Sequence, residues 1–199
     1  SFPLNSFLPA DSLGLLDLAL QAGGSGFDPL RAQTRGNIRL QVDRAEFRGR
    51  DFGGVKLNAN LEGGQLSGRL SDRDEALRLL LLISGTLTER KQEVRLTGNV
   101  FDFDLAELGI SPQKIGGSFA LEAGASASDA GSYTARIALD SIEVRTRHRT
   151  DRIRPTSLSL SSDTTATRAK LASGDLSLAF VSPGPVDSLV PALTRSTDI

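Results

Sequence analysis

The sequence contains no cysteine, no methionine and no tryptophan. Without cysteine the chain can form neither disulfides nor thiolate metal sites, and it has no thiol nucleophile. This absence is compatible with the cytosol and with a Gram-negative periplasm. Because position 1 is not methionine, we expect the chain to begin inside a longer protein, with any signal peptide or membrane anchor outside the printed sequence.

Strong charge of one sign and long apolar runs are also missing. The 199 residues carry a formal net charge of -1, whereas proteins that bind nucleic acid are usually basic. We therefore expect no nucleic-acid partner. The longest apolar run, LRLLLLI at residues 77–83, is interrupted by Arg78, and a helix that spans a bilayer needs roughly 20 apolar residues. The run indicates a more buried strand instead.

Residues suited to catalysis or metal binding are scarce. The single histidine, His148, lies in the arginine-rich segment VRTRHRTDRIR, and the sequence has no G-x-S-x-G motif. A zinc site usually needs three or four Cys, His or carboxylate ligands. Asp72, Asp74 and Glu75 lack the central glycine and distant glutamate of a calcium loop, so they indicate a charged turn. The sequence therefore predicts no catalytic residues, no enzyme activity, no metal site and no cofactor.

What the sequence does contain is a repeated alternation of apolar and polar residues. Between Val55 and Leu61 every second residue is apolar, and the pattern resumes at Leu66 after two glycines, Gly63 and Gly64. Such alternation is typical of a strand with one apolar face, and Gly-Gly between two runs predicts a tight hairpin. Similar runs recur along most of the chain.

Several segments interrupt this alternation. Residues 13–22 predict a strand, although PADSLGLLDLALQ could also form a short helix, and GGSG at residues 23–26 ends the segment. Short helical pieces are predicted near Pro9, Leu105 and Val186, the second being one helical turn or an irregular plug. GASASDAGS at residues 124–132 predicts a polar loop. Gly98 indicates a bulge or the close approach of another backbone.

Together these patterns predict an all-β, mainly antiparallel fold. We expect one β-rich segment over residues 1–199, with a weak break at 124–132, shaped as an elongated, U-shaped or partly open sheet with an apolar inner face and a few short helices. The apolar face must pack on a second sheet, close into a barrel or line a groove, and the pattern leaves open whether it is a groove or a closed core. Its expected residues are Ile38, Leu40, Val42, Val55, Leu57, Leu61, Leu66, Leu70, Leu79, Leu81, Ile83, Val94, Leu96 and Val100. The residues expected to be solvated opposite them are Lys56, Asn58, Asn60 and Glu62.

Five arginines between residues 145 and 154 form the one basic cluster of the sequence. Arg145, Arg147 and Arg149 would share one strand face by parity. A solvated outer face is the simpler interpretation. The alternative is an anionic contact, with lipid headgroups or with a partner protein.

The order of the repeats resembles a known family. The run GNIRLQVDRAEFRGRDFGGVKLNANLEGGQLSGRLSD, followed by LLISGTL and RLTGNVFDFDLAELGIS, is similar to the periplasmic repeats of the TamB and AsmA-like family, in particular its Bacteroidetes TamB-like members. FLPADSLGL ahead of GSGFD and the later SGDLSLAF also resemble that subgroup. The positions that carry the repeat pattern are Gly54, Val55, Leu57, Ala59, Leu61, Gly64, Leu66 and Gly68.

This resemblance implies a function that periodicity alone does not show. Family members form a long U-shaped sheet with an apolar lining and are anchored in the inner membrane of Gram-negative cells. They are thought to pass phospholipid across the periplasm to the outer membrane, some beside a BamA-type barrel partner. The implied cargo is the phospholipid acyl chain, and the implied role is support of outer-membrane biogenesis.

Two other functions fit the same stripes. In a structural or adhesive all-β module the stripes would pack against each other and bind no lipid. In a periplasmic chaperone-like protein, exposed strand edges would add strands of outer-membrane proteins to the sheet.

Overall fold

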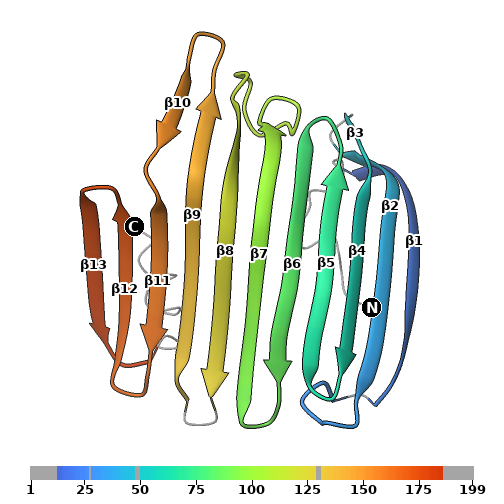
Figure 1. Cartoon of the computed structure of the whole chain (residues 1–199), viewed down its shortest axis with the longest axis vertical. Helices are drawn as coiled ribbons and strands as arrows, with labels where there is room; N and C mark the ends of the chain where they lie inside the picture. Colours follow the sequence, from blue (N-terminus) through green and yellow to red (C-terminus); the bar gives the residue numbers. More distant parts are fainter. Residues whose placement is uncertain (1–12, 27, 48–49, 129–130, 186–199) are drawn as a thin grey trace, which may run out of the picture.

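The computed structural model describes residues 13–26, 28–47, 50–128 and 131–185. These residues form a single antiparallel sheet of thirteen strands, and no helix occurs among them (Figure 1). The predicted all-β, antiparallel, open-sheet fold is therefore confirmed.

The sheet follows the chain almost strand by strand. The neighbour order is β1-β2-β4-β5-β6-β7-β8-β9-β11-β12-β13, while β3 pairs with β2 and β10 with β9. In Figure 1 the strands form one layer, which curls at the end that carries β1, β2 and β4. The strands are β1 Leu13–Ser25, β2 Arg35–Phe47, β3 Arg50–Phe52, β4 Val55–Glu62, β5 Gln65–Arg73, β6 Leu77–Leu87, β7 Lys91–Asp104, β8 Gly116–Ser128, β9 Tyr133–Arg145, β10 Thr150–Ile153, β11 Thr156–Ser162, β12 Ala166–Ser173 and β13 Leu176–Pro183.

The hairpin between β4 and β5 forms where the two glycines predict it. Gly63 and Gly64 have φ angles of 57° and 74°. A two-residue turn of this kind needs positive φ at both positions, which glycine adopts without a steric penalty. The hairpin fixes the register of β4 and β5, so that Leu61 lies opposite Leu66 and Leu57 opposite Leu70.

The segment after β7 forms one isolated helical turn, as the sequence predicts near Leu105, and does not continue into a helix. The Asp104 carboxylate accepts the N–H groups of Ala106 at 2.8 Å and Glu107 at 3.2 Å. The N–H of Leu108 donates to the Asp104 carbonyl at 2.9 Å, which gives a single helical turn. Gly109, with a φ of 70°, then ends it. The other two predicted helical pieces, near Pro9 and Val186, lie outside the described residues.

The prediction of a polar loop at residues 124–132 is wrong for residues 124–128. Strand β8 continues through Gly124 to Ser128 because it pairs on both sides, Ala125 lying opposite Val94 on β7 and Ala135 on β9. The hydrogen bonds between neighbouring strands join backbone groups and do not depend on the side chains. A run of small residues between two long strands therefore stays extended. The N–H of Ser128 donates to the Ser132 carbonyl at 3.0 Å, and the chain reverses there.

Gly98 on β7 lies against the neighbouring strand, as the sequence indicates. A Cβ atom at this position would lie 2.0 Å from the Leu80 carbonyl oxygen and 2.9 Å from the Leu81 Cα. Such a close approach leaves no space for a side chain unless the neighbouring backbone shifts. The missing side chain leaves room on the same face for Leu81, which lies opposite Gly98 and is only 7% exposed.

Candidate functional site

The strand register places apolar residues in rows that run across the sheet. Residues directly opposite each other on antiparallel strands point to the same face. One row crosses eleven strands, from β1 to β13, without a charged residue: Leu20, Leu40, Leu57, Leu70, Leu81, Gly98, Leu121, Leu139, Thr156, Ser173 and Leu176.

Two further rows beside it contain only apolar residues and glycine. We call these three rows the apolar face. With strands ~4.8 Å apart, the face extends ~48 Å from β1 to β13. The second row is Ala22, Ile38, Ala59, Gly68, Ile83, Leu96, Ala123, Ile137, Leu158, Leu171 and Leu178. The third row is Gly24, Gly36, Leu61, Leu66, Gly85, Val94, Ala125, Ala135, Leu160, Ala169 and Phe180.

All fourteen residues expected to line the apolar face lie on one side of the sheet. Ten of them belong to the three rows. The other four form two opposite pairs just beyond the first row, Val42 with Val55 and Leu79 with Val100. The register extends the face to β1, β8, β9 and β11–β13, to residues such as Leu20, Leu139 and Leu178 that are not among the fourteen.

No second layer covers the apolar face in the described part of the chain. The hydrophobic side chains that are buried there are Ala76, Leu81 and Val100. Side chains towards both ends of the rows are open to solvent: Ile38 is 46%, Leu158 47% and Leu178 56% exposed. A packed sandwich or barrel core would bury such residues. The face is therefore open along much of its length, and most shielded near its centre.

The opposite face is polar. Lys56, Asn58, Asn60 and Glu62 are all exposed, whereas the residues between them on β4 are half-buried, which confirms their predicted orientation. Leu82 is an exception: it points to the polar face, opposite Arg69 and Thr97, and is 51% exposed. The expectation of a more buried strand at residues 77–83 is therefore wrong at this residue, because no layer of the described residues packs on the polar side.

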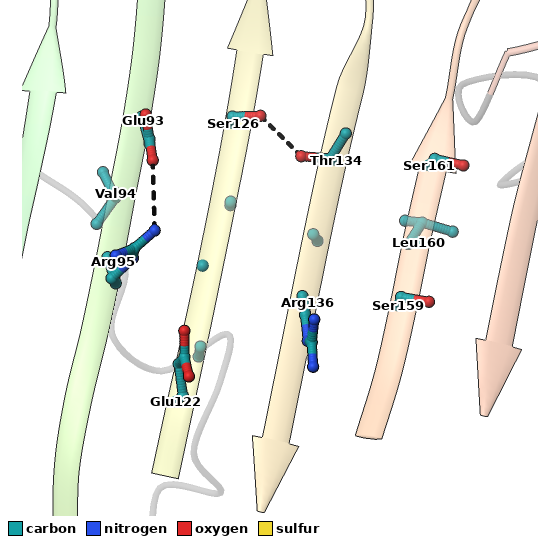
Figure 2. A pocket seen from close by; sticks show the side chains of 14 residues that line it. Glu93, Val94, Arg95, Glu122, Ser126, Thr134, Arg136, Ser159, Leu160 and Ser161 are labelled. Atoms are coloured by element: carbon teal, nitrogen blue, oxygen red, sulfur yellow. Dashed lines mark hydrogen bonds and ion pairs between the residues drawn. The ribbon is translucent and has the colours of Figure 1, made fainter. Parts of the chain in front are cut away.

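A shallow hollow on the polar face lies over β7, β8, β9 and β11 (Figure 2). Its volume is about 460 Å³, and small side chains line much of it. Ser126 and Thr134 hydrogen-bond across two strands at 2.7 Å, and Arg95 lies 3.9 Å from Glu93. Two carboxylates, Glu93 and Glu122, and two arginines, Arg95 and Arg136, line it, so the hollow has no net charge that would select an ionic ligand.

The acidic turn near Asp72 has a structural role. The Asp72 carboxylate accepts the Asp74 N–H at 2.9 Å, and Asp74 in turn accepts the N–H groups of Gly53 at 3.1 Å and Ala76 at 2.8 Å. Asp72 is buried, and this burial raises the pKa of its carboxyl group. Nowhere in the described residues do three His, Asp or Glu side chains come together in a way that could hold a metal ion.

The three arginines expected on one strand face do not share one. Strand β9 ends at Arg145, and the N–H of Thr146 donates to the Arg149 carbonyl at 2.9 Å. The chain therefore reverses at Arg147 and His148, which form the tip of the β9–β10 hairpin. Parity fails here because TRHR is a turn, although it contains neither glycine nor proline.

Two of these arginines are ion-paired. Arg145 binds Asp102, and Arg149 lies 2.7 Å from Asp151. Arg147 has no carboxylate oxygen within 4.0 Å among the described residues.

No protein-family model, no curated protein and no solved structure matches this chain. Among the described residues no helix is long and apolar enough to cross a membrane.

Proposed function

We propose that this chain is a segment of a TamB or AsmA-like envelope protein whose apolar face shields phospholipid acyl chains between the inner and outer membranes. The single observation that carries the proposal is the apolar face itself, three rows that cross eleven strands and stay partly open to water. The sequence resemblance gives the second support.

The physical argument for lipid binding rests on the apolar surface area that a bound acyl chain would remove from water. Burial of apolar surface stabilises by about 25 cal/mol per Å², so each ~100 Å² of covered tail contributes about 2.5 kcal/mol. Soluble monomers rarely expose contiguous apolar patches larger than a few hundred Å², and a face of this length needs an occupant. Because leucine, isoleucine and alanine offer an alkyl chain no directional bonds, neighbouring positions hold it equally well and it can slide from one to the next.

The rest of the proposal follows from the resemblance. The chain would lie in the periplasm, within a parent protein that is anchored in the inner membrane and, in some systems, works beside a BamA-type barrel. No enzyme activity and no cofactor are part of this function, since shielding an acyl chain needs only apolar surface.

Lipid extraction tests the proposal directly. The chain is purified without detergent, and its bound lipids are extracted and identified by mass spectrometry. We expect phospholipid to co-purify in at least equimolar amount. A lipid-free chain that remains folded and monomeric would contradict the proposal and favour a structural or adhesive module.

One feature favours a second function, the addition of foreign strands. Strand β13 pairs only with β12, and Leu176, Leu178 and Phe180 on it are 52%, 56% and 55% exposed. An open apolar edge is a template for another strand, as a chaperone for outer-membrane proteins would require. A lysine on this edge, Val181→Lys, should block the capture of an unfolded outer-membrane strand but leave lipid co-purification intact.

A further inference from the structure

A cavity at one end of the sheet lies between the loop that follows β7 and the tip of the β9–β10 hairpin. Residues 112–115 and 146–148 line it. Figure 1 shows both segments at the same end of the sheet, at the top of the view. We call it the basic cavity, because Lys114, Arg147 and His148 line it and no carboxylate does.

The cations of the basic cavity are not neutralised by their surroundings. Two carboxylates on the strands that lead into these turns, Asp102 on β7 and Asp151 on β10, are paired with other arginines, Arg145 and Arg149. Among the described residues, no carboxylate oxygen lies within 4.0 Å of the Lys114 ammonium or the Arg147 guanidinium. Two fixed positive charges and an imidazole, which can donate an N–H even when neutral, therefore face one small volume.

Hydrogen bonds from backbone N–H groups hold both walls of the cavity. On the hairpin side, the Thr146 hydroxyl oxygen accepts the N–H of Arg149 at 3.3 Å. On the loop side, the N–H of Leu105 donates to the Ile115 carbonyl at 2.8 Å, and the Ser111 hydroxyl accepts the N–H of Gln113 at 3.1 Å. The positive groups thus project from turns of fixed geometry, which lowers the entropy cost of binding a ligand between them.

We propose that the basic cavity binds a phosphate group. Arginine and lysine are the side chains that bind phosphate oxygens most strongly, through charge-assisted hydrogen bonds. The phosphate could be that of a lipid headgroup or a free phosphate, and the headgroup source rests on the function proposed above. In its favour, Phe119, opposite Val100 on the apolar side, is four residues from Ile115, or ~13 Å along an extended strand. One phospholipid could span that distance.

The test measures binding of inorganic phosphate and of dihexanoyl-phosphatidylglycerol to the full chain by calorimetry. The test variant is the double substitution Lys114→Ala with Arg147→Ala. The control is Arg90→Ala with Lys56→Ala, which removes the same charge from exposed positions away from the cavity. Arg90 is a close match for Arg147, since it lies in a hairpin turn that Thr88 closes as Thr146 does, its hydroxyl oxygen accepting the Lys91 N–H at 3.1 Å.

We expect the test variant to lose about tenfold or more in affinity for both probes, and the control to bind like the wild type. Equal affinity of the test variant and the wild type would overturn the proposal. Equal losses in both variants would overturn it too, because they would show non-specific attraction. If phosphate binds but the lipid binds no more tightly, the anion site stands and its assignment to a headgroup fails. Lipid extraction tests the apolar face independently of all these results.

Discussion

The substitution Leu57→Asp separates an open face from a packed core. Leu57 is half-buried at the middle of β4, between Leu40 on β2 and Leu70 on β5. Burying a whole leucine side chain contributes about 1.5–3 kcal/mol, so the loss of a half-buried one costs about 1 kcal/mol. Aspartate in a strand costs up to about 1 kcal/mol more. On an open face water still reaches the carboxylate, and the total is about 2 kcal/mol.

A closed core would give a different result. There the carboxylate would be buried without a partner, and the loss would exceed about 4 kcal/mol. For a chain of this size a loss of 2 kcal/mol lowers the melting temperature by about 4–8 °C. Thermal unfolding followed by circular dichroism measures this shift, and we expect a folded variant that melts within that range.

The neighbouring residue supplies the control. Asn58 points to the polar face, opposite Arg39 on β2 and Arg69 on β5. Asn58→Asp therefore places a carboxylate between two arginines. We expect it to change the free energy of unfolding by no more than about 0.5 kcal/mol, and to stabilise the fold because opposite charges then face each other across the strands. If Leu57→Asp fails to fold while Asn58→Asp is unchanged, the open-face interpretation is wrong. A folded Leu57→Asp variant that crosslinks to lipid from a probe at Leu61 as well as the wild type does would refute the lipid-shielding function.

Two other substitutions test the backbone and the acidic turn. Gly98→Ala should destabilise the sheet by about 1–3 kcal/mol in chemical denaturation, because its Cβ would lie 2.0 Å from a carbonyl oxygen. The control, Gly124→Ala, should be tolerated, because its Cβ would lie 3.6 Å from the nearest atom. Equal losses of stability in the two variants would show that the close approach at Gly98 is absent. Burial raises the folded-state pKa of Asp72 above 3.8. The stability that the protonated Asp72 carboxyl group adds to the folded chain is therefore fully present below pH 3.8, and it is lost as the pH rises through the folded-state pKa. Asp72→Asn should therefore raise the melting temperature at pH 7 and lose that advantage in acid, and an advantage independent of pH would contradict this.

Local features of the fold could be predicted where residues act through their own geometry. The alternation on β4 and β5 gives both strands and their faces, and Gly63 and Gly64 give the turn between them. The same rules give β9 and β13, whose apolar residues also alternate. The role of Gly98 could be predicted because a glycine within an apolar strand usually marks a bulge or the close approach of another backbone.

Other features depend on partners that a single segment does not contain. Gly124–Ser128 has the composition of a loop, yet two neighbouring strands hold it extended. The turn at Arg147 and His148 forms because β10 pairs with β9, and strand parity along one segment cannot show that. The apolar face is a property of the register between eleven strands, so its length was not predictable even though most of its residues were.

Site-specific photo-crosslinking tests the central claim most directly. A photoreactive amino acid is placed in the parent protein in cells, at Leu57 and Leu139 on the apolar face and at Asn58 and Ala138 on the polar face. Leu57 and Leu139 belong to the first row, and each control is a direct neighbour that points the other way. We predict phospholipid adducts at Leu57 and Leu139 and none at Asn58 and Ala138. Equal adducts on both faces, or none on either, would contradict the claim that the apolar face carries lipid.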